Sequence, residues 1–295
     1  MTLHIKTVDR GPAKHGRTMR TVALPSGERV PALGLGTWHF GEDPALRAQQ
    51  IATLRHAVDL GVTLIDTAEM YGEGLAEELI GEALSERRDE VFLVSKVYPH
   101  NASFYQLPVA CANSLHRLKT DRIDLYLLHW RGSIPLHETV AGFQALQDAG
   151  KIRYWGVSNF DTDDMQELWN VRGGTAAVTN QILYNLTRRG PEWELLPWMR
   201  QHKIPIMAYS PIEQARLLKN RRLIEFSKRH GMTPASAALG WLLANDDVIA
   251  IPKTSSPERL EEDVAALSIE LTAEQLAELD KLFPPPDGPR ALEML

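Results

Sequence analysis

The chain has 295 residues, of which 44% are hydrophobic, so it can bury a large core. Its net charge of −6 gives no sign of nucleic-acid or anionic-membrane binding, and its single cysteine excludes an intrachain disulfide framework. No apolar run approaches the ~18 residues that a membrane span needs, and the basic N-terminus lacks the apolar centre of a secretory signal. We therefore expect a cytoplasmic protein without nucleic-acid or membrane partners, in which residues 1–18 form a flexible tail.

From residue 19 the sequence predicts a short β-hairpin, followed by a regular alternation of strands and helices. Residues 19–31 form the hairpin, with its turn at Pro25-Ser26-Gly27. Most of the strand-like runs that follow are apolar on both alternating sets of positions, as in strands buried on both faces. These runs are 32–37, 62–67, 91–96, 123–129, 154–159, 176–182, 204–210 and 248–254.

Helix signals separate these strands. Asp43 followed by Pro44 predicts the start of the first helix, and Asp161 predicts the start of a later one. Two helical segments, 219–230 and 272–283, are additional to the alternating pattern.

Eight strands, each followed by a helix, predict an α/β fold. We expect a single (β/α)8 TIM barrel over residues 19–295, with an N-terminal β-hairpin and two additional helices. The competing fold is an open, doubly wound sheet, which binds nucleotides through a GxGxxG segment after its first strand. Here GLGTW at 34–38 and GEG at 72–74 both lack the third glycine. Because neither segment is a dinucleotide-binding fingerprint, we prefer the barrel and one domain.

Polar side chains follow three successive strands of the predicted barrel, at the end where such barrels carry their active sites. Asp66 ends the second strand, with Tyr71 in the loop beyond it, and Lys96 and His129 end the third and fourth strands. Neighbouring parallel strands lie about 4.8 Å apart, so the four side chains can converge. Asp66 can hold Lys96 charged, and the ammonium favours the phenolate, which lowers the pKa of Tyr71 from about 10. His129 can form a hydrogen bond to a substrate oxygen. The four residues together predict that Tyr71, with its pKa adjusted by Lys96, acts as an acid that protonates an alkoxide as it forms.

Such an acid needs a hydride source, and side chains do not supply one. Tyr209 offers an aromatic face for a nicotinamide ring, and Ser158, Asn159 and Gln181 offer hydrogen bonds that match its amide. The segment PKTSSPERLEED at 252–263 opens a helix flanked by basic side chains, which makes an anion site. The sequence has no metal-ligand spacing and no activated nucleophile, so we expect no metal.

From residue 19 the chain resembles the aldo-keto reductase family along essentially its whole length. The matching motifs are GLGTW (34–38), IDTAEMYG (65–72), VSK (94–96), LLHW (127–130), GVSNF (156–160), NQ (180–181), AYSP (208–211) and PKTSSPERLEED (252–263). The segments IDTAEMY, FLVSKVYP and DLYLLHW are similar to those of bacterial members of the methylglyoxal-reducing kind. The resemblance implies NADPH as cofactor and a catalytic tetrad of Asp66, Tyr71, Lys96 and His129.

The same resemblance implies a set of cofactor contacts along the chain. Those near the nicotinamide are Gly36, Thr37, Trp38, Asp66, Ser158, Asn159, Gln181 and Tyr209. Those along the pyrophosphate are Ser210, Ile212 and Gln214, in a segment shorter than in members that fold a long loop over it. Those at the adenosine 2′-phosphate are Lys253, Thr254, Ser255 and Arg259, with Glu262 and Asp263 near the adenine. Many family members have Asn where Asp263 stands.

Three aromatic residues, Trp38, Tyr98 and Trp130, follow strand ends and are expected to wall the substrate site around Tyr71 and His129. Aromatic walls under short loops predict an open site for small or aromatic aldehydes and ketones, including methylglyoxal and other 2-oxoaldehydes. Weaker activity is expected on aldoses and very little on steroids. We predict an NADPH-dependent carbonyl reductase that acts as a monomer without an obligate protein partner.

Two other functions remain open at this point. A barrel aldolase would use Lys96 to form a Schiff base and would need that lysine neutral. A nicotinamide-binding regulatory subunit would keep the cofactor site but turn over slowly.

Overall fold

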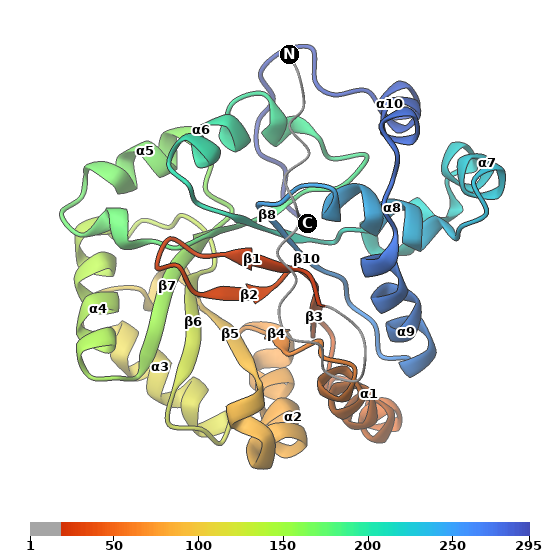
Figure 1. The fold of residues 1–295 in the computed structure, drawn as a ribbon. Coiled ribbons are helices and arrows are strands. Elements are labelled where there is room, and N and C mark those ends of the chain that lie inside the picture. Colours follow the sequence, from red (N-terminus) through yellow and green to blue (C-terminus); the bar gives the residue numbers. More distant parts are fainter. Residues whose placement is uncertain (1–18) are drawn as a thin grey trace.

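The computed structural model describes residues 19–295, and its centre is a barrel of eight parallel strands (Figure 1). The strands are Gly34–Gly36 (β3), Leu64–Asp66 (β4), Phe92–Val97 (β5), Ile123–Leu128 (β6), Ile152–Ser158 (β7), Asn180–Leu183 (β8), Ile206–Tyr209 (β9) and Val248–Ile251 (β10). They pair in chain order, and parallel bridges from Leu33 to Ala250 and from Gly36 to Lys253 join the first strand to the last. The predicted barrel is confirmed, whereas the tail predicted at 1–18 lies outside the described residues.

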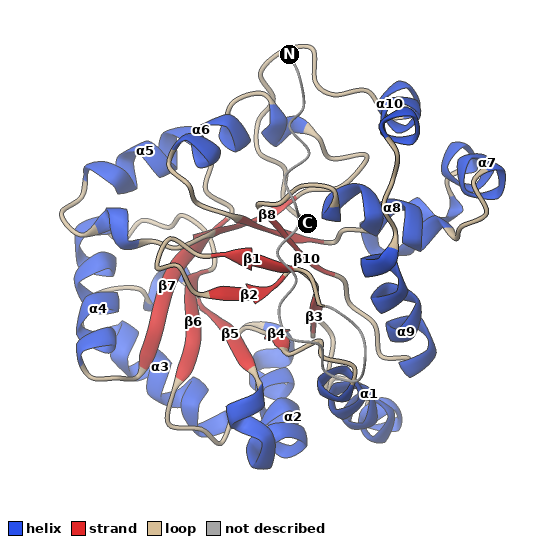
Figure 2. Ribbon diagram, viewed as in Figure 1, coloured by secondary structure: helices blue, strands red, loops and turns tan. Residues whose placement is uncertain are grey.

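Helices surround the strands on all sides (Figure 2). Those of the alternating pattern are Arg47–Asp59 (α1), Leu75–Leu84 (α2), Gln106–Arg117 (α3), Leu136–Asp148 (α4), Thr162–Asn170 (α5), Leu195–Gln201 (α6), Pro234–Leu243 (α8) and Pro257–Ala265 (α9). The two additional helices predicted from the sequence are present as Arg221–Arg229 (α7) and Ala273–Leu282 (α10). Short 3-10 turns lie at Pro44–Leu46, Tyr71–Gly74, Ser85–Glu90, Pro99–Asn101, Gly174–Ala176, Gly190–Glu192, Glu213–Ala215, Leu217–Lys219 and Ala266–Ser268.

Most strands are shorter than the predicted runs, and the starts of one helix and one strand differ for reasons that the local structure shows. Asp43 caps a 3-10 turn, accepting a hydrogen bond of 2.9 Å from the Ala45 amide, and the α-helix proper starts only at Arg47. The strand predicted at 176–182 begins later, because Ala176 still belongs to the turn that brings the chain back from α5. Gly173 at φ 85° permits that turn. Within residues 19–295, no helix is both long enough and apolar enough to cross a membrane.

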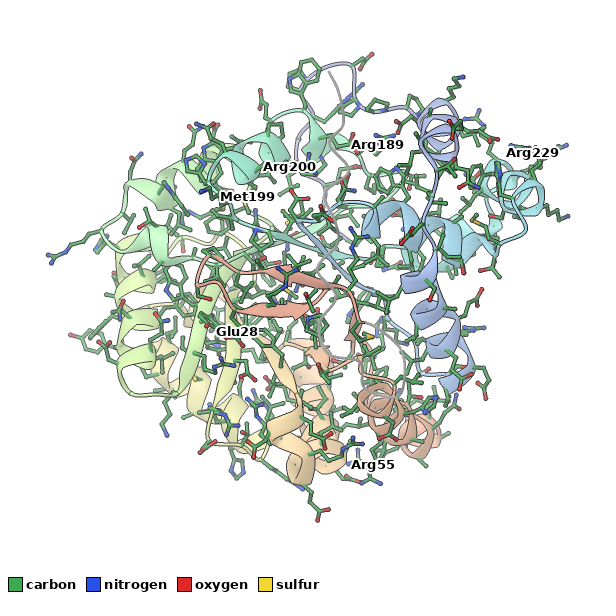
Figure 3. The ribbon with its side chains drawn as sticks, in the orientation of Figure 1. Glu28, Arg55, Arg189, Met199, Arg200 and Arg229 are labelled. Atoms are coloured by element: carbon green, nitrogen blue, oxygen red, sulfur yellow. The ribbon has the colours of Figure 1, made fainter. Side chains whose placement is uncertain are left out.

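The predicted hairpin consists of Thr21–Ala23 (β1) and Arg29–Pro31 (β2) and lies across the barrel (Figure 1). Glu28, in the turn directly before β2 (Figure 3), accepts hydrogen bonds of 2.6 Å from Arg153 and 2.7 Å from Tyr154. Both partners lie in the first three residues of β7. The hairpin therefore covers the end where the strands begin, opposite to the end where the predicted site residues lie.

Candidate active site

The barrel brings the four predicted catalytic residues together. Asp66 ends β4, Lys96 lies near the end of β5, and His129 directly follows β6. Tyr71 opens the 3-10 turn after β4, where Gly72 at φ 57° and Gly74 at φ 99° allow the chain to reverse. The rings of Tyr71 and His129 meet edge to face with centroids 5.9 Å apart.

Lys96 is the centre of this group. Its Nζ donates hydrogen bonds of 2.8 Å to Asp66 Oδ2, 2.8 Å to the Thr67 carbonyl and 3.1 Å to the phenolic oxygen of Tyr71. The lysine is 0% exposed and Asp66 is 2% exposed. An ammonium has three hydrogens to donate, and all three have acceptors here. The arrangement therefore fits a charged lysine paired with an ionised carboxylate.

The pKa shifts indicate a charged Lys96 and a neutral His129. Burial lowers the pKa of Lys96, but Asp66 and Tyr71 raise it more, so the net shift is upward and the ammonium persists. Burial, together with the charge of Lys96, lowers the pKa of His129 to about 2, so its imidazole is neutral. Its Nδ1 atom is buried without a hydrogen-bond partner among the described residues. A neutral imidazole keeps one N–H to donate and one nitrogen to accept.

The pKa of Tyr71 corrects one expectation. The sequence predicted that Lys96 lowers it, and the charge and hydrogen bond of Lys96 do act in that direction. Burial acts more strongly and raises it, and the Asp66 charge adds to the increase, so the net pKa lies above the usual value of 10.0. The expectation of a lowered phenol pKa was therefore wrong. Tyr71 keeps its proton at neutral pH, which is the state an acid needs before it reacts.

The residues predicted to hold the nicotinamide amide border these four side chains. Gln181 donates a hydrogen bond of 2.7 Å from Nε2 to Asp66 Oδ1. Ser158 donates a hydrogen bond of 2.8 Å to the Gln181 carbonyl, and Asn159 donates one of 3.1 Å to the His129 carbonyl. The Tyr209 hydroxyl donates 2.9 Å to Asn159 Oδ1. These four side chains therefore form one hydrogen-bonded arc over β7, β8 and β9 that ends on Asp66.

The predicted contacts after β3 are partly engaged within the protein. The Gly36 amide donates a hydrogen bond of 2.8 Å to the Pro252 carbonyl, and Thr37 Oγ1 donates one of 2.9 Å to the Asp66 carbonyl. Trp38 stacks on His39 with centroids 4.3 Å apart. Gly36 and Thr37 thus fix β3 against its two neighbours in the barrel.

The predicted 2′-phosphate residues surround the start of α9. Thr254 Oγ1 accepts a hydrogen bond of 3.1 Å from the Ser256 amide. Ser256 caps the helix by accepting a hydrogen bond of 3.3 Å from the Arg259 amide. The Ser255 carbonyl accepts 2.8 Å from Gln49 and 3.0 Å from Thr53, both in α1. This loop is therefore fixed before any ligand arrives.

Two cations flank that helix start. Lys253 has its Nζ 5.6 Å from the centre of the Phe40 ring, and burial lowers its pKa. No ion pair engages the Arg259 guanidinium within residues 19–295. A helix N-terminus with an unengaged cation in its first turn is suited to a phosphate.

Asp263, predicted to lie near the adenine, is a buried carboxyl group in α9 and is 5% exposed. Burial, with a contribution from the Glu262 charge, raises its pKa to about 7 against the opposing charge of Arg259. At neutral pH a substantial share of this group is therefore protonated and able to donate a hydrogen bond.

The predicted pyrophosphate residues Ser210, Ile212 and Gln214 lie in the loop after β9. The loop is short, since 3-10 turns at Glu213–Ala215 and Leu217–Lys219 lead directly into α7. Ser210 and Gln214 have φ of 48° and 52°, which side-chain-bearing residues seldom adopt.

Two of the three predicted substrate walls lie together. Tyr98 and Trp130 meet edge to face at 5.9 Å, and Trp130 lies 4.9 Å from the His129 ring. Sequence reasoning missed Glu69, whose Oε1 accepts hydrogen bonds of 2.6 Å from the Tyr98 amide and 3.1 Å from Asn101. Its signal was an acidic residue between Asp66 and Tyr71 in the same motif. Glu69 fixes the loop that carries the Tyr98 wall.

Comparisons with known proteins give the family. The model of the aldo/keto reductase family matches residues 32–283. Methylglyoxal reductase YeaE of Escherichia coli (strain K12) is 49% identical over 271 residues, covering 90% of this chain and 95% of its own. The 9,11-endoperoxide prostaglandin H2 reductase of Trypanosoma cruzi is 31% identical, covering 88% and 90%. The crystal structure of an aldo/keto reductase from Klebsiella pneumoniae in complex with NADP and acetate has a TM-score of 0.91 and 50% identity, covering 93% and 99%. The chain therefore belongs to the aldo/keto reductase family, a class of oxidoreductases.

Proposed function

We propose that this aldo/keto reductase uses NADPH to reduce small and aromatic aldehydes and ketones, including methylglyoxal and other 2-oxoaldehydes. The observation that carries the proposal is the hydrogen-bonded set of Asp66, Lys96 and Tyr71 beside the neutral His129. The similar methylglyoxal reductase of E. coli and the NADP complex from K. pneumoniae support the substrate class and the cofactor.

The residues along the barrel rim fit NADPH. Ser158, Asn159 and Gln181 carry the donors and acceptors that a carboxamide requires, and Tyr209 supplies an aromatic face beside them. The capped start of α9 with Arg259 fits a 2′-phosphate. When bound, the reduced nicotinamide supplies the hydride, which side chains cannot provide.

In the proposed mechanism the chain supplies the proton and orients the carbonyl. His129, neutral and placed edge to face with Tyr71, donates a hydrogen bond that orients the carbonyl oxygen. Tyr71 gives its phenolic proton to that oxygen as negative charge develops there. The Lys96 ammonium, 3.1 Å away, then stabilises the phenolate, and Asp66 keeps the ammonium in place.

The same geometry opposes the aldolase alternative. A Schiff base requires a neutral lysine with a free lone pair. Lys96 instead makes three hydrogen bonds and has a raised pKa. Treatment with methylglyoxal and borohydride should therefore leave no covalent adduct on Lys96, whereas an adduct would favour the aldolase.

Steady-state turnover tests the proposal against a regulatory subunit. The purified protein is mixed with NADPH and methylglyoxal, and the loss of reduced-cofactor absorbance is followed. We expect multiple turnovers, in the range of about 1–10³ per second that is typical of enzymes. Binding of NADPH without sustained turnover on any aldehyde would instead support the regulatory subunit.

We also infer that residues 19–295 form one catalytic domain that works in the cytoplasm without an obligate partner. The family match at 32–283 supports the domain assignment. The single cysteine, Cys111, is buried and free, which suits a reducing compartment.

A further inference from the structure

A buried carboxylate outside the proposed tetrad lies in the loop after β9. Glu213 is 5% exposed, and both of its oxygens accept hydrogen bonds. Oε1 accepts 2.7 Å and 3.1 Å from the Arg188 guanidinium and 3.0 Å from Arg216. Oε2 accepts 2.8 Å from Asn185. Two of these partners, Asn185 and Arg188, come from the segment after β8, so Glu213 ties two neighbouring loops together.

The loop that Glu213 anchors has an unusual backbone. Ser210, Glu213, Gln214 and Ala215 all have positive φ, from 48° to 66°. Residues with side chains persist in this region only where their surroundings impose it. Besides the packing of Ile212 on the core, polar contacts impose it here: the Ser210 carbonyl accepts hydrogen bonds of 2.9 Å from Asn185 and 2.9 Å from the Glu213 amide. The shape of the loop therefore depends on these contacts and not on its own backbone preference.

Glu213 holds these partners as an anion. Burial raises its pKa, but the hydrogen bonds and charges of Arg188, Asn185 and Arg216 lower it more, and the net shift is downward. The Arg188 guanidinium also pairs with Glu293 in the segment after α10. A neutral residue at 213 would leave Arg188 with weaker bonds to the loop, because bonds between charged partners are the stronger ones.

We propose that Glu213 is a positioning residue for NADPH, one that holds residues 210–215 in the conformation that receives the pyrophosphate. The inference rests on the proposed function, in which Ser210, Ile212 and Gln214 lie along that pyrophosphate. Glu213 lies between Ile212 and Gln214 in the sequence, but its own side chain bonds to Arg188, Arg216 and Asn185. Glu213 therefore acts on the cofactor through the conformation of the loop backbone. It does not contact Tyr71, the proton donor of the proposed function.

The test compares cofactor binding with chemistry. Glu213→Gln keeps the size of the side chain and removes its charge. NADPH affinity is measured by quenching of tryptophan fluorescence, and its dissociation rate by stopped flow. We expect the Kd to weaken by about tenfold or more, mostly through faster dissociation, as most affinity changes arise there. With a small aldehyde and saturating NADPH, kcat should stay within about twofold, because Tyr71 and Lys96 are untouched.

The control is Glu278→Gln in α10, which also removes a carboxylate bound to a guanidinium but pairs with Arg229 and His230, not with residues 210–215. Should Glu213→Gln fail to fold, as judged by its melting curve, Arg188→Gln breaks the same pair from the more exposed side and is expected to weaken NADPH likewise. Wild-type protein that does not bind NADPH would contradict the proposed function itself. Wild-type binding with an unchanged Kd in the folded variant, or a loss confined to kcat, would overturn the role of Glu213.

Discussion

Lys96 donates a hydrogen bond of 3.1 Å to the phenolic oxygen of Tyr71, and its Nζ lies 4.8 Å from the centre of the Tyr71 ring. Lys96 is buried and Tyr71 is partly buried, and burial by itself disfavours the phenolate. The adjacent ammonium offsets part of that cost. The pair therefore combines a firmly protonated acid with a nearby charge that stabilises the acid after it has lost its proton.

Lys96→Met tests this pairing. The substitution keeps the apolar stem and removes the charge, so the pKa of Tyr71 should rise further and reduction should lose most of its rate at neutral pH. It also leaves Asp66 buried without its cation, a change that costs about 3–5 kcal/mol of unfolding free energy in buried pairs. The measurements are kcat with NADPH in excess and the denaturant midpoint. A variant that is folded and changes only the KM of the carbonyl would make Lys96 a binding residue.

Arg259→Ala tests the cofactor preference. The guanidinium lies in the first turn of α9, beside the capped helix start. Charge-assisted hydrogen bonds to a 2′-phosphate contribute about 1.5–3 kcal/mol, so NADPH affinity should fall by about tenfold or more while NADH affinity barely changes. Arg221→Ala is the control, since that side chain is 91% exposed on α7. Equal affinity of the wild-type protein for NADPH and NADH would refute a 2′-phosphate role.

Asp263→Asn tests a titrating group in the proposed cofactor site. Burial raises the pKa of Asp263 to about 7, against about 3.9 in an unfolded chain. Between these two values the folded state binds more protons than the unfolded state, so stability falls as pH rises through this window. The variant should lose this dependence and gain about 1–4 kcal/mol of unfolding free energy at pH 8.

Denaturant unfolding of the ligand-free protein from pH 4 to pH 8 measures this effect. Asp121→Asn serves as the control, because its side chain is 81% exposed. Parallel curves for wild type and Asp263→Asn would show that the Asp263 carboxyl titrates with an ordinary pKa.

Trp130→Ala tests the proposed substrate wall. The Trp130 ring lies 4.9 Å from His129 and packs edge to face with Tyr98. Removing it should lower kcat/KM for 4-nitrobenzaldehyde by about tenfold, because a well-placed aromatic contact contributes about 0.5–1.5 kcal/mol beyond the area that it buries. Methylglyoxal, which is smaller, should lose less.

Wild-type specificity constants for methylglyoxal, 4-nitrobenzaldehyde, xylose and a 3-ketosteroid complete this comparison. The two aldehydes should lead. Xylose or the steroid outrunning both would show that the loops build a deeper and more selective site.

The sequence was sufficient to predict where Asp66, Lys96 and His129 meet. Each lies at or just beyond the end of an apolar strand, and barrel topology fixes how neighbouring strand ends converge. The hydrogen bond from Gln181 to Asp66 was not predictable, because it spans 115 positions and depends on side-chain direction across the barrel. The direction of the Tyr71 pKa shift was also not predictable. It is set by the balance between burial, which raises the pKa, and the Lys96 charge, which lowers it, and the sequence gives no measure of burial.

The contacts between loops were the least predictable part. Glu213 pairs with Arg188 because the irregular segment after β8 approaches the loop after β9, whose residues include several in the left-handed region. Neither residue lies in a periodic element, and the chain offers many other arginines as partners. Likewise, Glu69 accepts a hydrogen bond from the Tyr98 amide, and no local sequence pattern predicts the turn geometry that brings the two together.

The central claim is that Tyr71 is the general acid, and Tyr71→Phe tests it most directly. The variant keeps the ring against His129 and deletes only the hydroxyl that Lys96 contacts. With methylglyoxal and saturating NADPH, kcat should fall by about two to four decades, the usual contribution of general acid catalysis, while the Kd of NADPH stays nearly unchanged. A Tyr71→Phe enzyme that keeps more than about a tenth of wild-type turnover would contradict the assignment, because that loss is far below what such catalysis contributes.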